Sequence, residues 1–133
     1  MARSVEVLTT PAMDVADGQP TPAIRSFVLT TTEGEGVRLD SLRPMSRLIV
    51  RTAHSSYRLL VLSPHPSVSV QGGHFFHEPA EVLFRGAILG GTALRSGWLL
   101  VGYRMALWSP NGHLVTSPVR SIEMELDSLH GPF

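Results

Sequence analysis

The sequence predicts an all-β fold: a small single-domain β-barrel or β-sandwich of seven to eight mainly antiparallel strands. Three observations lead to this prediction. Short runs of apolar and β-branched residues recur along the chain, glycine and proline turns separate them, and no segment keeps a helical period for ten residues. With 133 residues, 43% of them hydrophobic and 17% charged, the chain suits one packed domain.

The chain divides into an N-terminal arm, a β domain and a tail. Residues 1–26 are predicted to form a flexible acidic arm, because their apolar residues keep no period of 2 or 3.6. Turn-forming residues interrupt this arm at Pro11, Gly18, Pro20 and Pro22. We expect the barrel or sandwich over residues 27–127 and a C-terminal tail over residues 128–133.

Each predicted strand ends at residues that favour turns. The first strand, residues 27–31, leads into Gly34-Glu35-Gly36, and the second, residues 37–39, precedes a single helical turn capped by Asp40-Ser41. The remaining strands are predicted over residues 47–53, 57–62, 67–71, 80–89, 98–108 and 114–126. Between them stand Pro64-His65-Pro66, the glycine pairs 72–73 and 90–91, and Gly97.

The last two predicted strands carry the strongest local signals. Pro110-Asn111-Gly112 between two apolar runs predicts a β-hairpin. Pro118 has no backbone N–H to donate, so it predicts an edge position or a bulge. Residues 98–108 form a long predicted strand, and both of its alternating faces are largely apolar. Such a strand is either enclosed between two sheets or buried in an interface.

Charge is distributed unevenly, although the formal net charge is zero. All eleven basic residues are arginine. Residues 1–40 carry six acids against three arginines, residues 41–120 carry two acids against eight arginines, and residues 121–133 carry three acids and no arginine. A basic body between acidic ends favours binding to an acidic surface, either on another protein or on a second copy of this chain.

Composition also excludes several classes of function. There is no cysteine, which removes disulfides, thiolate catalysis and cysteine-based metal sites. The first residues lack the apolar core of a signal peptide, and no apolar run approaches the length of a membrane span. We therefore expect a cytoplasmic protein without membrane contact. The zero net charge and dispersed arginines argue against nucleic acid. No Gly-x-Ser-x-Gly elbow is present.

Several phrases of the sequence resemble those of small uncharacterised all-β bacterial proteins. They are Arg51-Thr52 with Ser56-Tyr57, Gly72-Gly73 before Phe76, Gly90-Gly91 before Gly97-Trp98, and Thr116-Ser117-Pro118-Val119-Arg120. The resemblance covers roughly residues 39–122. It implies a single all-β domain and no particular activity.

A histidine-rich segment is similar to the first metal motif of the cupins. It consists of Gly73-His74-Phe75-Phe76-His77-Glu78 followed by Glu81, and His113 would stand for the histidine of the second motif. The resemblance implies a metal-dependent β-barrel enzyme in which His74, His77, Glu81 and His113 bind iron, manganese or zinc. The histidines are three residues apart, however, so on a regular strand they point to opposite faces, and only a bulge would bring them together.

A second resemblance is to PilZ domains, which are small β-barrels that bind cyclic-di-GMP. Arg43-Pro44-Met45-Ser46-Arg47 fits the RxxxR half of their pattern, and Ser67-Val68-Ser69-Val70-Gln71-Gly72 resembles the other half. Arginine suits this ligand because its guanidinium group pairs with phosphate and stacks on guanine. The chain departs from the pattern at Ser67, where aspartate or asparagine is expected, and at Pro44. The implied ligand residues are Arg43, Arg47, Ser69 and Gly72.

Taken together, these features favour a non-enzymatic binding or assembly module with no cofactor. We expect it to self-associate or to dock to an acidic protein partner. The predicted interface residues are Arg47, Arg51, Trp98, Arg104 and Trp108, because arginine and tryptophan are the usual anchors of protein interfaces. The cupin-like enzyme and the cyclic-di-GMP-binding barrel remain the alternatives.

Overall fold

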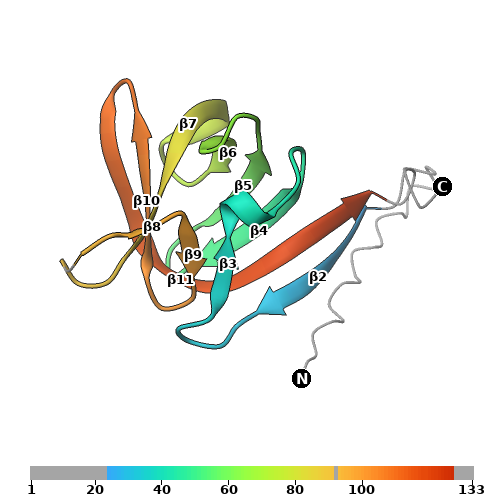
Figure 1. The fold of residues 1–133 in the computed structure, drawn as a ribbon, viewed down its shortest axis with the longest axis horizontal. Helices are drawn as coiled ribbons and strands as arrows, with labels where there is room; N and C mark the ends of the chain where they lie inside the picture. Colours follow the sequence, from blue (N-terminus) through green and yellow to red (C-terminus); the bar gives the residue numbers. More distant parts are fainter. Residues whose placement is uncertain (1–23, 92, 128–133) are drawn as a thin grey trace.

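The computed structural model describes residues 24–91 and 93–127, and nearly all of its regular structure is strand (Figure 1). The strands are β2 (Ile24–Thr30), β3 (Gly36–Arg38), β4 (Arg47–Thr52), β5 (Ser56–Val61), β6 (Ser67–Gly72), β7 (Phe76–Ile88), β8 (Arg95–Ser96), β9 (Trp98–Leu100), β10 (Arg104–Ser109) and β11 (Gly112–Asp127). One 3-10 turn, η2 (Leu39–Ser41), follows β3. The predicted all-β fold is confirmed.

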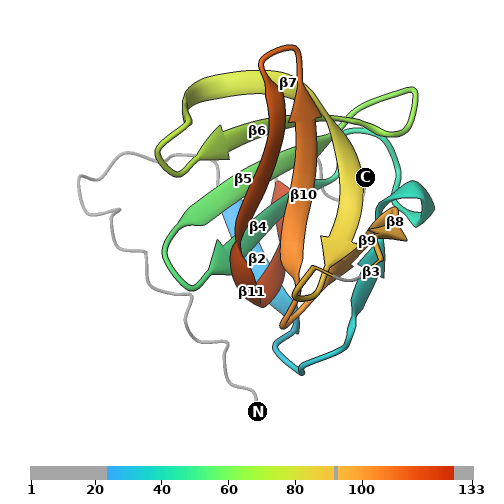
Figure 2. The same ribbon diagram turned by 90° about the vertical axis from the view of Figure 1, so that its left-hand side faces the viewer.

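Six strands close into an antiparallel barrel. Their order is β10-β11-β4-β5-β6-β7, and β7 pairs again with β10, so the ring of hydrogen bonds closes. Figure 2 shows these strands curving around one interior. Outside the ring, β2 pairs with β11, β8 pairs with β7, and β3 pairs with β9 in a separate two-stranded sheet.

The core forms from alternate residues of the ring strands, because successive side chains of a strand point to opposite faces. On β4, for example, Leu48 and Val50 are fully buried whereas Arg47 and Arg51 are exposed. The buried cluster comprises Leu39, Leu48, Val50, Tyr57, Leu59, Val68, Val70, Val82, Phe84, Leu99, Val101, Met105, Leu107, Val119 and Ile122. It includes residues of η2 and β9, so the small second sheet packs against the barrel.

The prediction of one long strand over residues 98–108 is wrong. The segment forms β9 and β10, separated by a turn at residues 101–103. Gly102 has a φ of 92°, a left-handed conformation that favours glycine, and its N–H donates to the carbonyl oxygen of Val119 at 2.8 Å. The apolar residues on both predicted faces are therefore divided between two strands with different partners, β3 for β9 and the barrel for β10.

Other boundaries also differ in detail. Strand β2 begins at Ile24, three residues inside the predicted arm, while residues 1–23 and 128–133 lie outside the described part of the chain. The predicted hairpin forms, but Ser109 pairs with Gly112, so Pro110 and Asn111 are its central residues. Pro118 lies opposite Arg104 beside a register shift between β10 and β11, which confirms the predicted bulge.

Candidate functional site

The most distinctive surface of the described chain is the outer edge of β2. This strand pairs with β11, with Phe27 opposite Met124 and Ser26 opposite Glu125. Among the described residues, no strand occupies its other edge. Figure 1 shows β2 alongside the C-terminal half of β11, at the end of the molecule far from the β10–β11 hairpin tip. A free edge presents unpaired N–H and C=O groups to another strand.

Three consecutive apolar residues on this edge strand are exposed to solvent. Phe27 is 45% exposed, Val28 is 37% exposed and Leu29 is 38% exposed. Because successive residues of a strand point to opposite faces, both faces of β2 carry accessible apolar surface. Edge strands usually carry charges, prolines or bulges that prevent pairing, and here the run of residues 26–30 contains no charge and no proline.

A shallow cleft adjoins β2 on the side of the second sheet. Its volume is about 230 Å³, and it is lined by Leu29, Thr30, Glu35, Gly36, Val37 and Ile122. The hydroxyl group of Thr30 donates to a carboxylate oxygen of Glu35 at 3.4 Å, which ties the loop before β3 to the end of β2. The apolar surface therefore continues from Leu29 toward Val37.

The outer face of β4, β5 and β11 carries charges of both signs. Arg51 forms an ion pair with Glu123 at 2.7 Å, and Arg58 lies 3.7 Å from Glu125. The carboxylate side chains are only 13% and 8% exposed, since the longer arginines lie over them. Two acids near the C-terminal end of the chain thus partly neutralise two arginines of the basic central segment within one molecule.

The predicted interface residues lie on three strands. Arg47 and Arg51 both lie exposed on β4, as predicted from their alternation. Trp98 is on β9, where the Arg38 guanidinium group lies 5.9 Å from the centre of its ring. Arg104 and Trp108 are on β10, and Arg104 donates to the carbonyl oxygen of Thr116 at 3.2 Å. Their role in an interface stays a prediction. Trp98 lies on a different strand from Arg104 and Trp108.

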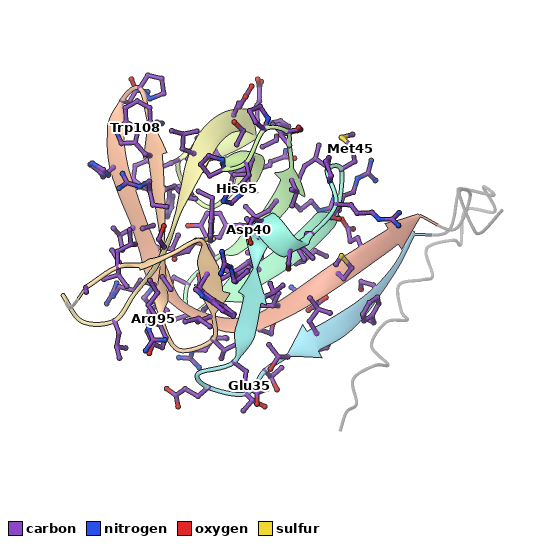
Figure 3. The ribbon with its side chains drawn as sticks, viewed as in Figure 1. Glu35, Asp40, Met45, His65, Arg95 and Trp108 are labelled. Carbon is purple, nitrogen blue, oxygen red and sulfur yellow. The ribbon has the colours of Figure 1, made fainter. Side chains whose placement is uncertain are left out.

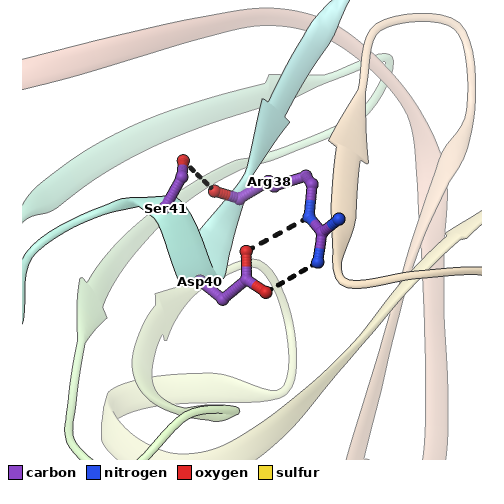
Figure 4. A network of polar contacts seen from close by, with 3 residues as sticks. All are labelled: Arg38, Asp40 and Ser41. Atoms are coloured by element: carbon purple, nitrogen blue, oxygen red, sulfur yellow. Dashed lines mark hydrogen bonds and ion pairs between the residues drawn. The ribbon is translucent and has the colours of Figure 1, made fainter.

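Arg38, which lies over Trp98, is fixed by a second contact (Figure 4). Its guanidinium nitrogens donate to both carboxylate oxygens of Asp40, at 3.2 Å from Nε and 2.7 Å from Nη2. The hydroxyl group of Ser41 donates to the carbonyl oxygen of Arg38 at 2.7 Å. The hydrogen bonds from Arg38 hold the pKa of Asp40 below its ordinary value, with a smaller electrostatic effect from His65.

The predicted metal ligands do not converge. Within residues 24–91 and 93–127, no three His, Asp or Glu side chains are placed to hold an ion. His74 lies in the turn between β6 and β7, His77 and Glu81 lie on β7, and His113 is the second residue of β11. All four are exposed, and their side chains therefore face solvent rather than a barrel interior filled by the apolar core. The described part of the chain therefore does not assemble the cupin-like ligand set.

The predicted cyclic-di-GMP residues are brought partly together. Arg47 pairs laterally with Leu60, and Leu60 pairs with Ser69, so Arg47 and Ser69 share one row of the outer face. Arg43 lies in the loop before β4, and Gly72 ends β6 three residues beyond Ser69. Binding of a cyclic dinucleotide to these residues stays a prediction.

The sequence did not predict that one edge of β2 has no partner strand among the described residues. A signal was present, because Phe27-Val28-Leu29 is an apolar run without polar alternation. Such a run predicts a strand, but it does not reveal whether one or both edges of that strand have partners.

No protein-family model, curated protein or solved structure significantly matches this chain. Within its described residues, no helix combines the length and apolar character needed to cross a membrane.

Proposed function

We propose that this protein is a non-enzymatic assembly module of the cytoplasm that self-associates through β2. In the proposed dimer, β2 of one copy pairs antiparallel with β2 of a second copy. One observation carries the proposal: β2 combines an edge without a partner strand in the described part of the chain with three consecutive exposed apolar residues, Phe27, Val28 and Leu29. Edge-to-edge pairing satisfies the unpaired backbone groups and removes apolar surface from water.

A second copy of the chain suits this edge because β2 is complementary to itself. A two-fold axis at Phe27 places residue 25 of one copy opposite residue 29 of the other, and residue 26 opposite residue 28. The single charged residue of the strand, Arg25, then lies opposite Leu29 and away from its own counterpart. The pairing therefore brings no like charges together and leaves the apolar centre enclosed.

Self-association is favoured over docking to an acidic partner for an electrostatic reason. Arg51 and Arg58 are already paired with Glu123 and Glu125 of the same chain. An acidic partner would have to displace those carboxylates, which remain attached nearby and compete at high local concentration. Pairing of β2 edges leaves both ion pairs intact.

Light scattering coupled to gel filtration tests the proposal on the full chain. The wild type is expected to form a dimer, and Val28→Lys is expected to raise the dissociation constant by about tenfold or more, because a lysine on each copy adds charge at the edge. Val115→Lys is the matched control, since Val115 is 46% exposed on the β10–β11 hairpin, away from β2. It is expected to dimerise like the wild type.

Amide hydrogen exchange identifies what covers the edge. If β2 edges pair, protection of the β2 amides rises with protein concentration in the wild type and not in Val28→Lys. Protection that is independent of concentration in a monomer would mean that another segment of the same chain covers the edge. A monomer with unprotected β2 amides would leave the edge for a different partner. Either of these two results would overturn self-association.

A further inference from the structure

A cleft of about 470 Å³ lies on the outer side of the barrel, over the middle of β7. It is lined by His65, Pro66, Leu83, Phe84, Arg85, Ser96, Gly97 and Trp108. These residues come from the loop before β6, from β7, from the β8 segment and from β10. The volume falls within the range of about 300–1,000 Å³ typical of small-molecule sites. Figure 3 shows Trp108 near the tip of the β10–β11 hairpin and His65 nearer the middle of the view.

The walls of the cleft are held by backbone hydrogen bonds on both sides of β7. The N–H of Phe84 donates to the carbonyl oxygen of Pro66 at 2.9 Å, which fixes one wall. The N–H of Gly97 donates to the carbonyl oxygen of Arg85 at 3.0 Å, which fixes the other. The cleft is therefore formed before any ligand enters, and little ordering has to accompany binding.

A β-bulge occurs at Arg85, which lines this cleft. Phe84 pairs with Leu107 and Gly86 pairs with Ala106, so Arg85 is an extra residue with no counterpart on β10. A bulge of this kind redirects a side chain and is common beside functional sites. Arg85 is exposed on the same face of β7 as Leu83, whereas Phe84 and Gly86 are buried.

The cleft presents one cation and one aromatic ring to solvent. Arg85 is exposed and makes no ion pair with any carboxylate of the described residues. Asp40, which interacts electrostatically with His65, already accepts two hydrogen bonds from the guanidinium group of Arg38. Trp108 is 37% exposed, and Leu83 pairs with it on the same outer row of the barrel. An uncompensated guanidinium group beside an indole favours an anion that also carries a flat ring.

We infer that this cleft binds a small molecule with a phosphate group attached to a planar heterocycle, of the size of a nucleoside monophosphate. The fork of Arg85 pairs with the phosphate oxygens, and His65 supplies a second donor from the opposite wall. The heterocycle stacks on the indole of Trp108. The site is separate from the β2 edge, so ligand binding does not depend on self-association.

Titration of the full chain with adenosine monophosphate, monitored by NMR, tests this site. The probe is expected to shift the indole N–H resonance of Trp108 and the Nε–H resonance of Arg85 in a saturable manner. Adenosine and inorganic phosphate, each carrying one half of the probe, are expected to bind about tenfold or more weakly, because each satisfies one side of the cleft. Shifts that do not saturate by about 10 mM, or phosphate binding as tight as that of the nucleotide, would overturn the inference.

Substitutions locate the binding determinants. Arg85→Gln is expected to raise the dissociation constant for the nucleotide by about tenfold or more, since it removes the charge-assisted pair. Trp108→Leu is expected to weaken the nucleotide and leave phosphate binding unchanged. Arg120→Gln is the control, because Arg120 is an exposed arginine of β11 that does not line the cleft. Equal binding by Arg85→Gln and the wild type contradicts the site, as does an equal loss in Arg120→Gln.

Discussion

Replacement of Thr116 by valine tests how the bulge in β11 is stabilised. Thr116 is 4% exposed, and its hydroxyl oxygen accepts the N–H of Met105 at 3.1 Å. The same hydroxyl donates to the carbonyl oxygen of Ser117 at 2.7 Å. The register between β10 and β11 shifts at this point, so the side chain supplies the acceptor that the ladder lacks.

The magnitude follows from which group is left without a partner. Valine has nearly the shape of threonine, so Thr116→Val opens no large cavity, but it leaves the Met105 N–H without its acceptor. Met105 is 1% exposed, so water does not readily replace the lost partner. A buried unsatisfied donor costs about 1–3 kcal/mol. The Ser117 carbonyl oxygen is less costly because Ser117 is half-buried and accessible to water. We expect Thr116→Val to lower the free energy of unfolding by about 2 kcal/mol.

Urea denaturation followed by circular dichroism measures this loss. The control is Thr116→Ser, which keeps the hydroxyl and removes one buried methyl group, at a cost of about 0.8 kcal/mol. The valine variant is therefore expected to be clearly less stable than the serine variant, although it retains more apolar surface. A valine variant as stable as the serine variant would refute the assigned role of the hydroxyl group.

Two further predictions concern a close backbone approach and an ion pair. A Cβ at Gly86 would overlap the carbonyl oxygen of Arg95, so Gly86→Ala is expected to lower the free energy of unfolding by about 3 kcal/mol or more. A Cβ at Gly90 meets open space, so Gly90→Ala is expected to cost only the backbone strain of about 1–2 kcal/mol. Equal losses of stability for Gly86→Ala and Gly90→Ala in urea denaturation would contradict this reasoning. Asp40 has a lowered pKa in the folded state. Its ionised carboxylate therefore stabilises the fold above the unfolded pKa of about 4, and this stabilisation is lost as the pH falls through the folded pKa. The stability difference between wild type and Asp40→Asn in urea is therefore expected at pH 6 and reduced at pH 3, and a difference that does not change with pH is the contrary result.

Most of the fold was predictable because strand signals are local. The strand predicted over residues 47–53 corresponds to β4, Arg47–Thr52, within one residue. Pro118 correctly marks a bulge because proline removes a donor wherever it stands. The segment of residues 98–108 failed for the opposite reason. Its composition fits a continuous strand, whereas the turn at Gly102 is fixed by a hydrogen bond to Val119, which is remote in sequence.

The candidate site was less predictable, because it depends on which residues share a surface. The histidines near residues 74–77 suggested a metal centre, yet their side chains remain exposed and separate from His113. Arg85 carried no signal in the sequence, since the cleft that it lines is assembled from β7, β8, β10 and the loop before β6. The ion pairs of Arg51 and Arg58 likewise join residues more than sixty positions apart.

By itself the sequence determined the class of the fold and the approximate strands, because backbone preference and side-chain alternation act over neighbouring residues. Its composition also excluded cysteine chemistry. The tertiary structure alone decided that the sheet closes at β7 and β10, that one edge of β2 has no partner strand among the described residues, and that Arg85 and Trp108 border one cleft. These features depend on pairing between distant strands. A shift of one residue in that pairing changes which side chains meet without altering any local pattern.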